Sequence, residues 1–225
     1  VTLIDENAFA ECARLTSVNF GSGVKSIGKT AFSFCEALEE ITIPGNVTLI
    51  GEAAFFGCPK LKNVHLDDGL ETIGISAFGL CKALEEITIP DSVTIIDESA
   101  FSICSKLATV HLGNGLQTIK NEAFYGCSAL ESITIPDSVT EIEQGAFASC
   151  SELKTVQLSK NLTGIASKTF NESGLTEITV PEGITAIGSF AFSKCDDLKN
   201  VVLPDSLTSL GTYAFYNCSS LPSVI

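Results

Sequence analysis

The strongest constraint on the fold of this chain is a repeat of 23 residues. Seven cysteines from Cys12 to Cys150 follow one another at this interval, and the same interval separates Cys195 from Cys218. A phenylalanine stands three positions before each of these cysteines. Between Cys150 and Cys195 lies one unit that is a residue shorter and carries Ser173 at the cysteine place. The chain is therefore built from similar short units, which is the signature of a repeat protein.

Ten units cover residues 1–225, and the last unit is incomplete. A typical unit is VTIIDESAFSICSKLATVHLGNG, residues 93–115. A unit of this length cannot bury its apolar side chains alone, whereas stacked units cover one another. We therefore expect a single solenoid domain over residues 1–225 and, because the last unit stops short, a fragment of a longer chain. The units start at Val1, Val24, Val47, Leu70, Val93, Leu116, Val139, Leu162, Ile184 and Leu207.

The second half of each unit predicts a short β-strand. In LATVHL, residues 107–112, Val110 and Leu112 point inward and Thr109 and His111 point outward by strand alternation. Successive units are expected to pair these strands in parallel at about 4.8 Å per unit, giving about nine complete strands. The A-F-x-x-C segment predicts a tight irregular or 3₁₀ turn with its phenylalanine in the core.

The nine cysteines are expected to be reduced core residues. Each of the nine lies three positions after a phenylalanine and three before a leucine, as in Phe101, Cys104 and Leu107. Disulfides are the alternative, but side chains stacked in parallel keep their Cβ atoms about 5 Å apart, beyond the usual 3.5–4.5 Å. No C-x₂₋₄-C pair suggests zinc. We therefore predict no metal, no cofactor and no catalytic cysteine.

The units resemble those of the BspA-like (Treponema-type) leucine-rich repeat class. LETIGISAFGLCKALEEITIP, residues 70–90, follows the pattern L-x-x-I-x-x-x-A-F-x-x-C-x-x-L-x-x-I-x-I-P along its whole length. The resemblance implies an α/β-type leucine-rich repeat solenoid, mostly β with short 3₁₀ or irregular turns. It places the parallel strand ladder on the concave face. It also implies a surface-exposed or secreted protein of a bacterium or protist that binds other proteins.

Charge and motif content argue against several classes of function. The formal net charge is −14, and so acidic a surface repels nucleic acid and anionic lipid. No apolar run is long enough to insert into a membrane. The two histidines, His65 and His111, lie two units apart, too far to share one zinc ion. No nucleophile-elbow or phosphate-binding glycine motif occurs, so we predict that the protein is not an enzyme.

Two surfaces are candidates for binding. The first is the outward side of the predicted strands, which presents a grid of short polar side chains, as the binding faces of solenoids do. The second is an apolar patch beside the phenylalanine row, where most other units carry glycine, serine or a charged residue. The strand candidates are Glu40, Thr42, Asn63, His65, Glu86, Thr88, Thr109, His111, Thr134 and Gln157; the apolar patch comprises Phe34, Phe56, Leu80 and Ile103.

Two functions remain open at this stage. The first is a non-enzymatic, adhesin-like binding module whose strand face takes a protein, such as a host extracellular-matrix or surface protein, or a glycan. The second is a structural spacer or self-assembly segment of a larger cell-surface protein, since self-association is compatible with a repeat surface. Through the family resemblance, both predict an extracellular or cell-surface location.

Overall fold

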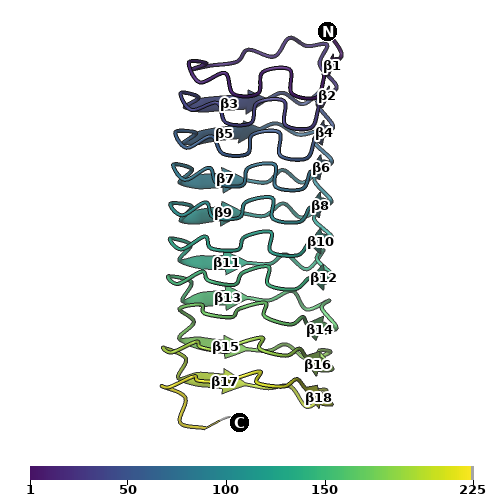
Figure 1. The fold of residues 1–225 in the computed structure, drawn as a ribbon. Coiled ribbons are helices and arrows are strands. Elements are labelled where there is room, and N and C mark those ends of the chain that lie inside the picture. The colour runs from purple at the N-terminus through teal and green to yellow at the C-terminus, as the bar shows by residue number, and fades with distance from the viewer. Residues whose placement is uncertain (224–225) are drawn as a thin grey trace.

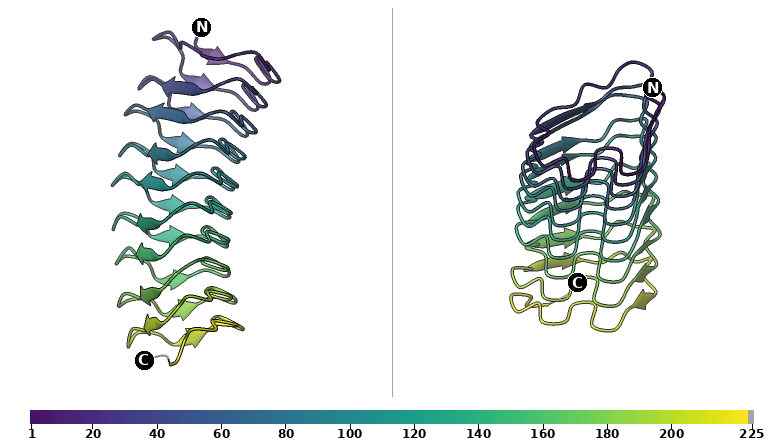
Figure 2. Two further views of the ribbon diagram at one scale, coloured as in Figure 1. Left: turned by 90° about the vertical axis from the view of Figure 1, so that its left-hand side faces the viewer. Right: turned by 45° about the horizontal axis from the view of Figure 1, so that its top comes forward.

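The computed structural model describes residues 1–223 as a column of stacked coils, one coil for each sequence unit (Figure 1). Every coil carries a two-residue strand at its third and fourth positions, and coils two to nine also carry a longer strand near their end. The two rows of strands run along opposite edges of the column in Figure 1, and the column is only slightly curved in Figure 2. The expected parallel-strand solenoid is confirmed.

The bounds of the strands follow the repeat. The short strands are β1 (Leu3–Ile4), β2 (Ser26–Ile27), β4 (Leu49–Ile50), β6 (Thr72–Ile73), β8 (Ile95–Ile96), β10 (Thr118–Ile119), β12 (Glu141–Ile142), β14 (Gly164–Ile165), β16 (Ala186–Ile187) and β18 (Ser209–Leu210). The long strands are β3 (Glu40–Ile43), β5 (Asn63–Leu66), β7 (Glu86–Thr88), β9 (Thr109–His111), β11 (Ser132–Thr134), β13 (Thr155–Gln157), β15 (Glu177–Thr179) and β17 (Asn200–Val202).

A stack of phenylalanine rings fills the centre of the column. The ring of Phe101 lies 5.4 Å from that of Phe78 and 5.3 Å from that of Phe124, with the planes nearly parallel. The rings from Phe32 to Phe192 are fully buried, whereas Phe9 in the first coil is 42% exposed. Burial of a ring this size is worth about 1.5–3 kcal/mol, and each inner ring is covered by both neighbours. Stacking of the coils therefore creates the core, as the sequence predicted.

The cysteines are free thiols and line the same core. Cys35 to Cys195 are buried, and Cys12 and Cys218 in the end coils are half-buried. The Sγ atom of Cys104 donates to the carbonyl oxygen of Phe78 in the preceding coil at 3.2 Å. The same bond recurs in the other inner coils, so a thiol at this place fills a small apolar space and gives the phenylalanine carbonyl a donor.

Three features differ from the sequence expectation. Residues 1–223 contain no helix and no 3₁₀ segment, so the α/β label is wrong and the fold is all-β with turns. The segment corresponding to the long strand in the first coil, residues 16–20, is not a strand, so eight long strands form instead of nine. The row of short strands was not anticipated. It pairs in register from β1 to β12 and again from β14 to β18, with a break beside the shortened unit.

Candidate functional site

The strand face, formed by the outward side chains of the long strands, carries all ten polar residues singled out in the sequence. Each of them is exposed, while the residues between them point into the core. The register places Glu40 beside Asn63 and Thr42 beside His65, and in the same way Thr88 lies beside His111. Strand alternation and the 23-residue period together explain this arrangement. The predicted grid of polar side chains is therefore present.

The ladder of long strands is divided into pairs, which the sequence analysis did not foresee. β3 pairs with β5, β7 with β9, β11 with β13, and β15 with β17. Within residues 1–223, no strand pairing joins β5 to β7 or β9 to β11, although these neighbours lie side by side. The strand face is consequently a series of two-stranded blocks that repeats every 46 residues.

Proline contributes to the division into pairs. In the first pair, the N–H group of Asp67 extends the ladder by donating to the carbonyl of Ile43 at 3.0 Å. The equivalent residue one coil later is Pro90, which has no N–H group to donate. Pro136 holds the same place beyond the next gap. Proline alone is not sufficient, because β15 and β17 pair although Pro204 follows β17.

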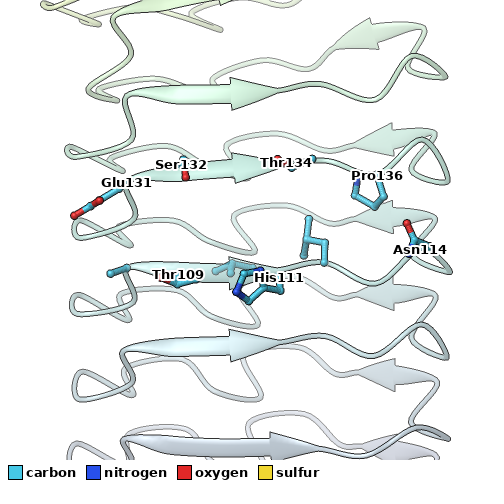
Figure 3. Close-up of a pocket in the computed structure, with 10 residues that line it drawn as sticks. Thr109, His111, Asn114, Glu131, Ser132, Thr134 and Pro136 are labelled. Atoms are coloured by element: carbon cyan, nitrogen blue, oxygen red, sulfur yellow. The ribbon is translucent and has the colours of Figure 1, made fainter.

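A hollow of about 390 Å³ lies over the gap between β9 and β11 (Figure 3). Thr109 and His111 reach it from β9, and Ser132 and Thr134 reach it from β11. The loop residues Asn114 and Pro136 line one end, and Glu131 and Leu112 complete the lining with Ala108 and Val110. This arrangement offers hydrogen-bond donors and acceptors around a partly apolar floor.

A second hollow of about 370 Å³ lies over the paired strands β3 and β5, nearer the start of the column. His65 and Asn63 line it from β5, Glu40 and Thr42 from β3, and Glu86 from β7. Among residues 1–223, neither Glu40 nor Glu86 has an ion-pair partner, so this hollow carries two unpaired carboxylates. It is suited to a basic group. Of the ten predicted strand-face residues, eight therefore line one of the two hollows, and Thr88 and Gln157 lie beside them.

Ion pairs elsewhere on the face are exposed and weak. Lys62 Nζ lies 3.2 Å from Glu85 Oε2 of the following coil. His65 Nε2 lies 2.9 Å from Asp67 Oδ1. His111, its counterpart in the other hollow, has Gly113 at the place of Asp67. The two hollows thus each contain a histidine and differ in charge.

The thiols do not belong to this site. Burial raises the pKa of Cys104 from 9.0 to about 12. Burial likewise raises the pKa of Cys58 and of Cys150 to about 12. Because the thiolate is the reactive form, these cysteines are inert at neutral pH. Among residues 1–223, no cluster of three or more histidine, cysteine or acidic side chains is arranged to hold a metal ion.

The apolar patch lies on a different surface, the turn face. In each coil this face is formed by the residues between the short strand and the long strand. Phe34 and Ile103 are exposed there, and Phe56 and Leu80 are half-buried. The structure therefore places the two predicted surfaces on separate sides of each coil.

Comparison with known proteins identifies the repeat. A family model described as "BspA type Leucine rich repeat region (6 copies)" matches residues 1–108, 71–195 and 165–225. The chain belongs to the BspA-type leucine-rich repeat family. The resemblance noted in the sequence is thereby confirmed over the whole chain. None of the curated proteins gives a significant match.

Solved structures of bacterial leucine-rich repeat proteins share the architecture. A leucine-rich repeat protein from Bacteroides ovatus matches 100% of this chain and 70% of its own, with 29% identity and a TM-score of 0.61. A leucine-rich cell surface protein from Faecalibacterium prausnitzii matches 100% of this chain and 82% of its own, with 26% identity and a TM-score of 0.55. The T. pallidum leucine-rich repeat protein matches 93% of this chain and 79% of its own, with 26% identity and a TM-score of 0.53.

The hollows were missed in the sequence, although a signal for them was present. Segments such as EITIP alternate with segments such as TVHLG, so the chain has a weaker period of 46 residues. That period coincides with the pairing of the long strands and with the spacing of His65 and His111, one of which lines each hollow. The described residues also include no helix that could cross a lipid bilayer.

Proposed function

We propose that this BspA-type repeat domain is a non-enzymatic binding module and that its partner lies across the strand face. The observation that carries the proposal is the pair of hollows, each built from outward side chains of neighbouring strands. A rigid ladder presents these side chains with little entropy to lose on binding. The cysteines, which are the strongest potential nucleophiles, are buried in the core, except that Cys12 and Cys218 in the end coils are half-buried.

The charge of the face favours a partner with basic groups. The chain has 27 acidic and 13 basic residues, and Glu40 and Glu86 flank one hollow without an ion-pair partner. An arginine or lysine side chain placed between them would gain charge-assisted hydrogen bonds. A protein is therefore the preferred partner, and a neutral glycan is the second candidate because the hollows also hold hydroxyl and amide groups.

The setting that we propose is the cell surface or the extracellular space, with an adhesin-like role. The Faecalibacterium prausnitzii relative is described as a cell surface protein, and it matches this chain along its whole length. An extracellular-matrix or surface protein of a host is the partner class to test first.

The test is a binding assay with immobilised matrix proteins and a glycan array, followed by single alanine variants of any binder found. His65→Ala, Glu86→Ala and His111→Ala are each expected to weaken the measured affinity. Glu71→Ala is the control, because Glu71 is an exposed acid outside the strand face. If a partner binds all three variants with unchanged affinity, its binding surface lies outside the strand face. If no partner is found, the alternative of a structural spacer is favoured.

A further inference from the structure

The apolar patch stands on backbone positions that favour glycine. In every coil the seventh and eleventh residues have a positive φ, and Phe34, Leu80 and Ile103 occupy the eleventh position with φ of 56°, 61° and 57°. The left-handed conformation turns the N–H group toward the next coil, as in the bond from Ile103 to the carbonyl of Tyr125 at 2.7 Å. Gly57 and Gly126 hold this position without strain in other coils.

Large apolar residues at these positions are unfavourable for folding. A left-handed conformation brings the Cβ atom of an L-residue close to the backbone, and a β-branched residue such as Ile103 is the worst case. Ile103 is nevertheless 40% exposed and Phe34 is 47% exposed. The exposed apolar side chains of Phe34 and Ile103 thus stand on a left-handed backbone position, the kind of position that is often found at functional surfaces.

The four side chains form one continuous strip along the column. The rings of Phe34 and Phe56 meet edge to face with their centroids 5.6 Å apart. Each ring leans over the following coil, so a Cβ atom at Gly57 would lie 2.7 Å from the ring of Phe34 and one at Gly79 would lie 2.9 Å from that of Phe56. The apolar strip (Phe34, Phe56, Leu80 and Ile103) therefore crosses coils two to five.

Opposite charges flank the apolar strip on its two sides. The chain crosses the turn face from the short strand to the long strand. The sixth residue of a coil, soon after the short strand, therefore lies on one side, and the thirteenth and fourteenth, nearer the long strand, lie on the other. Three alternate coils carry an acid on the first side and a base on the second: Glu6 with Arg14, Glu52 with Lys60, and Glu98 with Lys106. All six side chains are exposed.

The second coil reverses both signs. Lys29 lies on the first side and Glu36 on the second, and both are exposed. Lys29 also pairs with Glu52 of the next coil at 2.9 Å. In each of these four coils, therefore, the two sides carry opposite charges.

This pattern is self-complementary under one symmetry operation. A two-fold axis parallel to the column brings two turn faces together so that each coil lies opposite the same coil of the second copy. The first side of a coil then faces the second side of that coil in the other copy. Glu52 then faces Lys60 of the second copy, and Glu98 faces Lys106 of the second copy. A two-fold axis across the column at the third coil would instead lay acid on acid and base on base in coils one, three and five, which is repulsive. A two-fold interface brings the same patch of both copies together, as this one requires.

We propose that the turn face of coils one to five is a homodimer interface in which two chains lie side by side and point in the same direction. The apolar strip forms its centre, and the acid–base pairs form its rim. Five coils span about 24 Å at 4.8 Å per coil. Because the patch is confined to five coils, we expect the dimer to be weak and dependent on concentration.

The first test removes the apolar strip without disturbing the backbone. The double variant Phe34→Gly/Ile103→Gly places glycine where the backbone favours it, so thermal stability should be kept. Sedimentation velocity over a concentration series should show the wild type moving from monomer to dimer and the variant remaining monomeric. A wild-type chain that stays monomeric to millimolar concentration, or a variant that dimerises equally well, would overturn the proposal.

The second test addresses the charged rim of the interface. Lys60→Glu/Lys106→Glu makes both sides acidic in two coils, and Glu52→Lys/Glu98→Lys makes them basic, so each variant alone should remain monomeric. Mixed in equal amounts, the two variants should form a heterodimer, because every facing pair is again of opposite sign. Failure of the mixture to associate would refute the pairing of these charges across the interface. The control His65→Ala lies on the strand face and should dimerise as the wild type does, which separates this proposal from the proposed function.

Discussion

Raising the pH should unfold this protein through its buried thiols. Burial raises the pKa of Cys104 from 9.0 to about 12, and it does the same for Cys58, Cys150 and Cys195. An unfolded thiol therefore loses its proton first, near pH 9, while the folded one keeps it. The stabilising contribution is complete below pH 9 and is lost as the pH rises through the window between 9 and 12.

The magnitude follows from the width of that window. Between pH 8 and pH 10 an unfolded thiol changes from mostly protonated to mostly ionised, and a buried thiol of pKa about 12 hardly changes. Each such thiol then lowers the free energy of unfolding by about 1.4 kcal/mol, since one pKa unit corresponds to about that energy. Four thiols together lower it by roughly 5–6 kcal/mol, a large fraction of the stability of a domain.

The assay is urea unfolding at pH 8 and pH 10 under reducing conditions, with one cysteine removed. Lysine and tyrosine also titrate in this range, so the informative quantity is the difference between variants. Cys104→Ala should lose about 1.4 kcal/mol less than the wild type between the two pH values. Leu107→Ala is the control, because it damages the same core and keeps all nine thiols. An equal pH dependence in the wild type and in Cys104→Ala would refute the reasoning.

Three further predictions concern the column itself. Phe101→Ala should lower the free energy of unfolding by about 3–5 kcal/mol in urea titrations. Phe9→Ala should lower it by less than half as much, because the ring of Phe101 is covered by a neighbouring ring on both sides and the ring of Phe9 on one side only. Gly57→Ala should cost about 1–2 kcal/mol in the same titrations, since its φ is +69° and the added Cβ atom would meet an aromatic ring. In native protein, a bulky thiol reagent should label the half-buried Cys12 faster than the fully buried thiols, as peptide mapping after quenching would show.

The sequence was sufficient for the core and for the strand face. The spacing of Phe101, Cys104, Leu107 and Val110 predicts that each of these side chains points inward. Because similar units stack on one another, the inward side chains of all units form one core. The exposed positions of Thr109 and His111 follow from the same alternation. Register was predictable because a slip would move every apolar side chain out of the core.

The sequence was insufficient where the backbone departs from regular structure. A two-residue strand such as Thr118–Ile119 is too short to produce a pattern of its own. The left-handed positions are also hidden, because glycine marks the eleventh place only at Gly57 and Gly126 while Phe34 and Ile103 hold it in other coils. The gaps between paired strands depend on single hydrogen bonds, which side-chain patterns do not encode.

The division of the long strands into pairs also sets the smallest piece that the chain can lose or gain. Residues 70–115 contain one complete pair, β7 and β9. Excising this piece joins Gly69 to Leu116, the same Gly–Leu junction that the chain already has at Gly115–Leu116 and Gly69–Leu70. Excising one coil alone would instead leave a long strand without its mate. Length variants of this protein should accordingly differ by even numbers of coils, so that recombination between gene segments shortens or extends the column in double steps.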